Sequence, residues 1–129
     1  MDILIAIAKE EERKQLKAAL DEQGHNVMAI TSLVHLRNLL GANYSVGYIV
    51  ADNQLDGYTG TQIIEKVGFY TPALIIGANN RFVNFILRKR CFPNATFSPT
   101  EVDLRKKREL IHAWLDTNSQ SSAPKQKRA

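Results

Sequence analysis

Apolar residues occur along this chain in two patterns, one that predicts strands and one that predicts helices. Short apolar runs occupy five segments, residues 2–8, 27–30, 48–51, 72–76 and 95–97. Runs of this length predict strands buried on both faces of a parallel sheet. Between them, helical spacing of apolar residues covers five more segments, residues 10–23, 32–41, 61–67, 81–90 and 101–115. Strands that alternate with helices in this way indicate an α/β fold with a doubly wound parallel sheet.

Length and composition predict one domain followed by a tail. The 129 residues are 44% hydrophobic, which is enough to bury a substantial core. We assign residues 1–116 to this domain. Residues 117–129 are polar, small or basic without an apolar stripe, so we expect a disordered basic tail or a linker. Because no apolar run approaches roughly 20 residues and no signal-peptide pattern is present, we expect a cytoplasmic protein without membrane contact.

The net charge of +4 is unevenly distributed. Residues 1–80 carry 6 Lys and Arg against 9 Asp and Glu, a balance of −3, whereas residues 81–129 carry 11 against 4, a balance of +7. A basic half of this kind attracts acidic proteins, nucleic acid or anionic lipid, although a solvated helix face has the same composition.

One apolar run ends in a carboxylate. The segment from Tyr48 to Gly60 passes from strand residues to Asp52 and then into a loop in which Gly57 permits a tight turn. Open α/β sheets present their functional groups at the carboxyl ends of the strands. Asp52 is therefore the leading candidate for chemistry in this chain.

A resemblance to CheY-like receiver domains of response regulators rests on four spaced residues, Asp52, Leu55, Gly57 and Gly60. Receivers commonly have a proline in this phospho-acceptor segment where this chain has Asp56. The resemblance covers about residues 2–116. It implies a flavodoxin-like, CheY-like sheet of five parallel strands in the order 2-1-3-4-5 with five helices. It also implies that Asp52 stands at the position that is phosphorylated in two-component signalling.

The chain departs from the receiver pattern at the positions that perform the chemistry. Receivers end the first strand with two acids that hold Mg²⁺, where this chain has Ile7 and Ala8. The receiver hydroxyl, switch aromatic and lysine correspond to Gly77, Ala95 and Ser98. Phosphoryl transfer to a carboxylate depends on a metal and basic groups to neutralise charge. We therefore expect an isolated carboxylate without a counter-charge, no bound Mg²⁺ or other cofactor, and no enzymatic activity.

Asp52 then has three interpretations: a vestigial acceptor, a working acceptor, or a structural acid that caps the following loop. Lys9 directly follows the missing acids and is a candidate ion-pair partner for Asp52; a solvent-facing lysine is the alternative. Three acids begin the first helix, where the helix dipole favours them; substitute metal ligands are the weaker interpretation of Glu10, Glu11 and Glu12.

Two basic clusters occur in the C-terminal half: Arg88, Lys89 and Arg90, and Arg105, Lys106, Lys107 and Arg108. In receivers, the fourth helix, fifth strand and fifth helix form the face used for dimers and effectors. By this resemblance, the clusters predict a face for an acidic protein partner, such as a kinase, a regulator or a transcription component, or for a homodimer. A solvated face is the alternative.

The resemblance and the departures together predict a pseudo-receiver that binds a protein partner independently of phosphorylation. One alternative is a genuine phosphorelay receiver that is phosphorylated on Asp52. The second alternative is a small nucleic-acid-associated regulator that contacts phosphates through its basic C-terminal half. The sequence shows no recognition-helix signature and no aromatic residues interleaved with the basic ones. A steep loss of binding with rising salt would distinguish the nucleic-acid alternative from a hydrophobic protein interface.

Overall fold

The computed structural model describes residues 2–77, 90–98 and 102–128, with side chains up to residue 118. Within this part of the chain, one parallel sheet is formed by β1 (Asp2–Ala6), β2 (Asn26–Ala29), β3 (Tyr48–Asp52), β6 (Ala73–Ile76) and β7 (Ala95–Ser98). The strand order is β2-β1-β3-β6-β7, and each neighbouring pair is parallel. The predicted order 2-1-3-4-5 is therefore confirmed.

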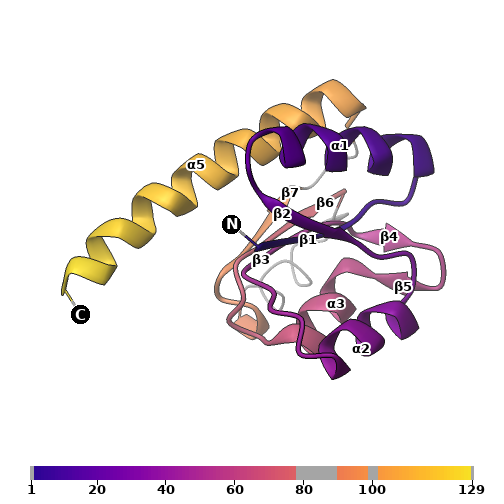
Figure 1. The fold of residues 1–129 in the computed structure, drawn as a ribbon, viewed down its shortest axis with the longest axis horizontal. Helices are drawn as coiled ribbons and strands as arrows, with labels where there is room; N and C mark the ends of the chain where they lie inside the picture. The colour runs from indigo at the N-terminus through magenta and orange to yellow at the C-terminus, as the bar shows by residue number, and fades with distance from the viewer. Residues whose placement is uncertain (1, 78–89, 99–101, 129) are drawn as a thin grey trace.

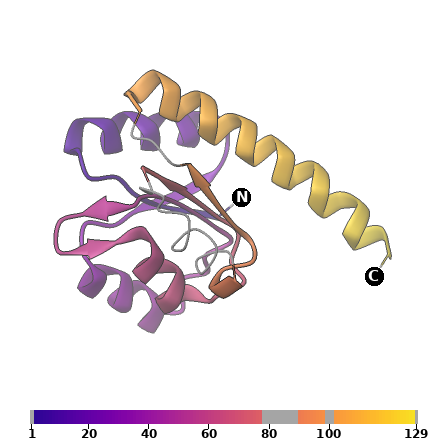
Figure 2. The same ribbon diagram turned by 180° about the vertical axis from the view of Figure 1, so that it is seen from behind.

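Helices cover both faces of the sheet (Figures 1 and 2). The described helices are α1 (Glu10–Glu22), α2 (Leu33–Gly41), α3 (Gly60–Val67) and α5 (Leu104–Arg128). α1 and α5 lie on one face, and α2 and α3 lie on the other. The predicted helix over residues 81–90 lies almost entirely outside the described residues. No helix in the described part of the chain has the length and apolar character of a membrane span.

The core consists of two hydrophobic clusters, one on each face of the sheet. Along β1 and just beyond it, Ile3, Ile5 and Ile7 pack with α1 and α5, whereas Leu4 and Ala6 pack on the side of α2 and α3. Successive side chains of a strand point to opposite faces, so a strand that is apolar at every position requires both clusters. This arrangement explains why the strand segments read as continuous apolar runs.

The segment after β3, which was predicted to be a loop, contains a hairpin. β4 (Gln54–Leu55) and β5 (Tyr58–Thr59) pair antiparallel across Asp56 and Gly57. Gly57 has a φ of 84°, and an Asp-Gly pair between two strands is a strong hairpin signal. The side chain of Thr59 then caps α3, with Gln62 completing a capping box.

α5 differs from its prediction at both ends. It begins at Leu104 rather than at residue 101, and Asp103 Oδ1 accepts a hydrogen bond from the Lys106 N–H at 2.9 Å, as a helix-capping side chain does. It continues to Arg128, although residues 117–129 were predicted to be disordered. Extending a helix that packing has already nucleated adds a backbone hydrogen bond for each residue with an N–H, which includes every residue of the polar segment except Pro124. The division into a domain, 1–116, and a tail stays a prediction.

Candidate functional site: the charged cluster around Asp52

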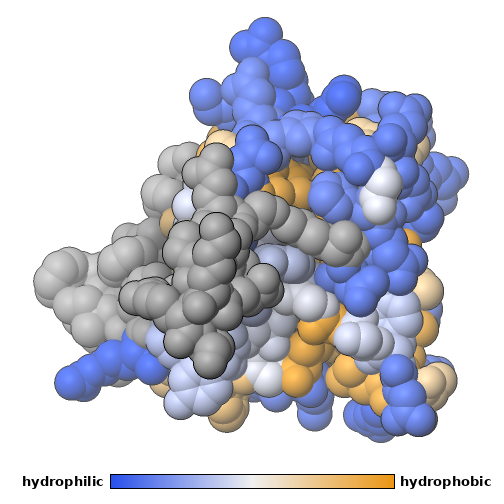
Figure 3. Space-filling view, turned by 60° about the vertical axis from the view of Figure 1, so that its left-hand side comes forward, coloured by the Kyte–Doolittle hydropathy of each residue, from blue (hydrophilic) through white to orange (hydrophobic). Residues whose placement is uncertain are grey.

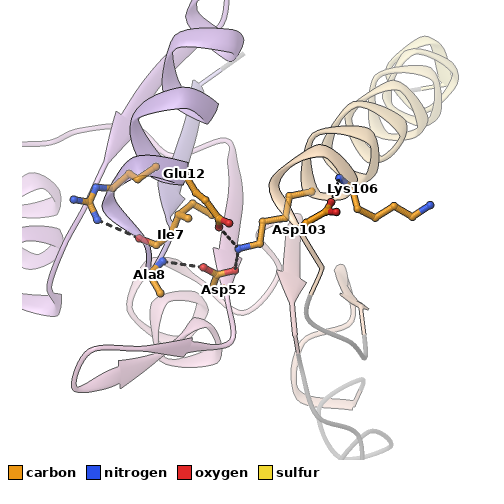
Figure 4. Close-up of polar contacts among 8 residues, drawn as sticks. Ile7, Ala8, Glu12, Asp52, Asp103 and Lys106 are labelled. Carbon is orange, nitrogen blue, oxygen red and sulfur yellow. Dashed lines mark hydrogen bonds and ion pairs between the residues drawn. The ribbon is translucent and has the colours of Figure 1, made fainter.

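Asp52 is the last residue of β3 and lies at the carboxyl edge of the sheet. Its side chain is largely buried, and its Oδ2 accepts a hydrogen bond from the Ala8 N–H at 2.8 Å (Figure 4). The chain can pass closely here because residue 60 is glycine: a Cβ atom on Gly60 would lie 2.9 Å from the Asp52 carbonyl oxygen. The backbone therefore holds this carboxylate in a fixed position against the end of β1.

The second oxygen of Asp52 is paired with a lysine from the far end of the chain. Lys107 Nζ lies 2.9 Å from Asp52 Oδ1 and 2.7 Å from Glu12 Oε1. Figure 4 shows the carboxylates of Glu12 and Asp52 pointing towards one another from α1 and β3. The side chains of Lys107, Glu12 and Asp52 are only 7%, 13% and 12% exposed. We call these three residues the charged cluster.

The position of Lys107 follows from the rotation of α5. Lys107 precedes Ile111 by four residues and Trp114 by seven, so all three belong to one helical stripe. Ile111 and Trp114 are buried against the sheet, and the Trp114 ring packs edge-on against Tyr48 with 5.8 Å between centroids. This packing turns the lysine inwards at the end of α5 that is nearest the carboxyl edge.

The electrostatics of the cluster keep Lys107 charged. Burial lowers the pKa of Lys107, because an ammonium ion is poorly solvated inside a protein. The hydrogen bonds and charges of Glu12 and Asp52 act in the opposite direction and outweigh burial, so the pKa of Lys107 lies above its ordinary value. At neutral pH the cluster therefore contains a buried ammonium held by two acidic side chains.

The raised pKa of Lys107 predicts that the folded state is weakened at alkaline pH. A base with a raised folded-state pKa contributes stability below its unfolded pKa, about 10.4 for lysine, and loses it as the pH passes through the folded value. We expect urea denaturation to show a fall in unfolding free energy above about pH 10. The fall in unfolding free energy should be smaller in Lys107→Met than in the wild type. Both proteins contain the same buried tyrosines, so the ionisation of these tyrosines does not contribute to the difference. Equal falls in the two proteins would contradict the prediction.

The structure changes the expected surroundings of Asp52. Lys9 is exposed and lines a cavity of about 70 Å³ beside Asp52, but no ion pair of its side chain is found within the described residues. Lys107 pairs with Asp52 instead, so the expectation of an isolated carboxylate is wrong. Lys107 had been assigned to an exposed basic face, and that assignment is wrong because the lysine is buried.

Glu12 and Lys107 were not predicted to lie beside Asp52. Glu12 lies in the first turn of a helix, where acids are common, so its position gives no sign of a buried partner. It is also 95 residues from Lys107 in the sequence. One signal was present in the sequence: Lys107 lies on the apolar stripe of its helix, where an unpaired lysine would be costly. A charged residue on a buried stripe predicts a buried partner, although it does not say which carboxylate that partner is.

No family model matches the chain, and no curated protein sequence matches it. Solved receiver domains do match. The non-phosphorylated HemR receiver domain from Leptospira biflexa has a TM-score of 0.68 at 20% identity, over 88% of this chain and 92% of that chain. The receiver domain of the hybrid histidine kinase CckA has a TM-score of 0.62 at 17% identity, over 89% and 99% of the two chains. The beryllofluoride-activated NtrC receiver domain has a TM-score of 0.65 at 16% identity, over 90% and 95%.

The chain has the receiver-domain fold. The structure describes the three residues that align with the receiver hydroxyl, switch aromatic and lysine. Gly77 has a φ of 77°, a conformation that favours glycine and would strain a β-branched threonine. Ala95 is fully buried at the start of β7, and Ser98 is half-buried at the end of β7, opposite Ile76. The interpretation of these positions as degenerate stays a prediction.

The residues around Asp52 do not fit the Mg²⁺ ion that receivers hold. Mg²⁺ requires nearly octahedral coordination by oxygen atoms. Ile7 is an apolar core residue, and Ala8 offers Asp52 a backbone N–H rather than a carboxylate. The nearby acid, Glu12, is paired with the same ammonium as Asp52. Within the described residues, no group of three or more His, Cys, Asp or Glu side chains is arranged to hold a metal.

Proposed function

We propose that this chain is a pseudo-receiver: a non-enzymatic domain that binds a protein partner without being phosphorylated, in two-component signalling or transcriptional regulation. The observation that carries this proposal is the engagement of both Asp52 oxygens inside the protein, by the Ala8 N–H and the Lys107 ammonium. Attack on a phosphoryl donor requires a carboxylate oxygen that is free to react and a metal that neutralises the incoming charge. The cluster provides one cation, and that cation is already shared with Glu12.

The exposed basic residues at the start of α5 support an acidic protein as the partner. Arg105, Lys106 and Arg108 are exposed, as is Arg90 before β7, whereas Arg88 and Lys89 lie outside the described residues. Arg105 and Lys106 approach Glu109 at 3.9 Å and 3.6 Å, but exposed pairs of this kind are weak and easily exchanged for a partner's carboxylates. The partner's acidic residues would contact Arg105, Lys106 and Arg108, because Lys107 is buried and is not part of the exposed face of α5.

The exposed residues at the start of α5 are charged, which favours a polar rather than an apolar interface. On the face drawn in Figure 3, hydrophilic residues predominate at the top and on the right, and hydrophobic residues reach the surface in smaller areas among them. Charged complementarity between partners increases the association rate and the specificity more than the affinity. We therefore propose a salt-sensitive association rather than a permanent one.

A titration with Mg²⁺ and beryllofluoride, which together mimic a phosphorylated aspartate, tests the proposal. We expect no saturable shift in the amide signals of Asp52, Gly77 and Ser98 of the isotopically labelled protein at millimolar ligand. Asp52→Asn is the matched control, because it keeps the shape of the side chain and removes the acceptor charge. Saturable shifts in the wild type that are absent from Asp52→Asn would contradict the proposal and support a genuine phosphorelay receiver.

A further inference from the structure

We infer that the Lys107 ammonium is the built-in cation of this site, in place of the divalent ion for which the chain lacks ligands. The inference deepens the proposed function and rests on it, since a site with a permanent internal cation has no need of a metal. It assigns Lys107 the role of neutralising Glu12 and Asp52 and of tying α5 to the carboxyl edge of the sheet.

The geometry of the carboxylates supports this assignment. Glu12 approaches from α1 and Asp52 from β3, and both contact one nitrogen at 2.7 Å and 2.9 Å. Two buried like charges repel one another strongly unless a cation lies between them. Lys107 therefore provides the attraction that allows these two acids to share a largely buried space.

Other nearby cations do not perform this role. Arg13 Nη1 donates a hydrogen bond to the Ile7 carbonyl oxygen at 3.2 Å, and no contact joins it to Glu12 or Asp52 within the described residues. Lys9 is exposed at the rim of the cavity beside Asp52. Among the residues that the structure describes, the cation in contact with both carboxylates comes from α5.

The assignment has a specific consequence for a variant without the ammonium. Asp52 and Lys107 both line the cavity of about 70 Å³. Lys107→Ala enlarges this cavity by the volume of the missing side chain and leaves Glu12, which contacts the Lys107 ammonium at 2.7 Å, beside the space that the ammonium occupied. Protein-bound Mg²⁺ usually keeps several of its water molecules and contacts only one or two carboxylates, so two unpaired acids provide the protein ligands it needs. We therefore expect Lys107→Ala to gain a divalent-cation site that the wild type does not have.

The test compares the wild type, Lys107→Ala and Lys106→Ala with Mg²⁺ and with paramagnetic Mn²⁺ as probes. Lys106→Ala is the matched control, because Lys106 is an exposed neighbour on the same helix. We expect Mn²⁺ to broaden the amide signals of Ala8 and Asp52 saturably in Lys107→Ala, and Mg²⁺ to raise its Tm, with neither effect in the other two proteins. Adding Asp52→Asn to Lys107→Ala should abolish both effects.

Each outcome supports or overturns a defined claim. If Lys107→Ala is unfolded without metal, restoration of its circular dichroism by Mg²⁺ supports the inference, and a chain that stays unfolded at every Mg²⁺ concentration overturns it. A folded Lys107→Ala that is unaffected by both ions also overturns it while leaving the proposed function intact. Saturable effects around Asp52 in the wild type would instead overturn the absence of a metal site on which the proposed function depends.

Discussion

Replacing Lys107 with methionine is expected to lower the free energy of unfolding by about 3–5 kcal/mol. Methionine keeps most of the length and apolar character of the lysine stem but removes the ammonium. Glu12 and Asp52 are then left as uncompensated charges, with side chains 13% and 12% exposed. Breaking a buried ion pair is costly for this reason, even though forming one contributes little net stability. Urea denaturation followed by the fluorescence of Trp114, the single tryptophan, measures the loss.

Two further variants separate the charge effect from packing. Lys106→Met removes an exposed ammonium whose contact with Glu109 is 3.6 Å, and we expect it to cost less than about 1 kcal/mol. The triple variant Glu12→Gln, Asp52→Asn and Lys107→Met removes all three charges together. We expect it to recover most of the stability that Lys107→Met loses. A triple variant as unstable as Lys107→Met would show that shape rather than charge determines the loss.

Replacing Trp114 with alanine is expected to cost about 3–5 kcal/mol. The Trp114 side chain is buried between α5 and the sheet, and its ring meets Tyr48 edge-on with an interplanar angle of 89°. The substitution removes a large apolar surface and leaves a cavity that the surrounding residues fill only in part. Circular dichroism should follow this unfolding, because the variant lacks the tryptophan fluorophore.

Trp114→Phe is the matched variant, because it keeps an aromatic ring against Tyr48 and loses less buried area. We expect its loss of stability to lie between those of the wild type and Trp114→Ala. Equal losses in the two variants would contradict the prediction, because they would show that an aromatic ring at position 114 stabilises the fold no more than alanine does.

These two predictions concern the same structural element. Trp114 attaches α5 through apolar contacts, and Lys107 attaches it through the charged cluster near the start of the helix. The helix then runs away from the sheet towards Arg128 (Figures 1 and 2). The part of α5 that is fixed to the domain is therefore also the part that presents Arg105, Lys106 and Arg108 to solvent.

The location of Asp52 could be predicted from the sequence, whereas the identity of its ion-pair partner could not. The location of Asp52 at the end of a buried strand followed from one apolar run, and the structure confirms it. The start of the predicted helix over residues 32–41 is confirmed as well, because the Ser32 Oγ accepts the His35 N–H at 3.0 Å and caps α2. Lys9 was named as a candidate partner of Asp52, with a solvent-facing lysine as the alternative, because it follows the first strand in sequence. Proximity along the chain does not determine which ammonium is buried.

The sequence by itself determined the alternation of strands and helices and the two-sided burial of the sheet, because hydrophobic periodicity is a local property of the chain. The extent of α5 and the composition of the charged cluster depended on the tertiary structure. Glu12 and Lys107 are 95 residues apart, and they meet because crossover connections bring the start of α1, the end of β3 and the start of α5 to one edge of the sheet. Lys107 neutralises both carboxylates because the packing of α5 buries its ammonium between them. No local sequence pattern determines this contact.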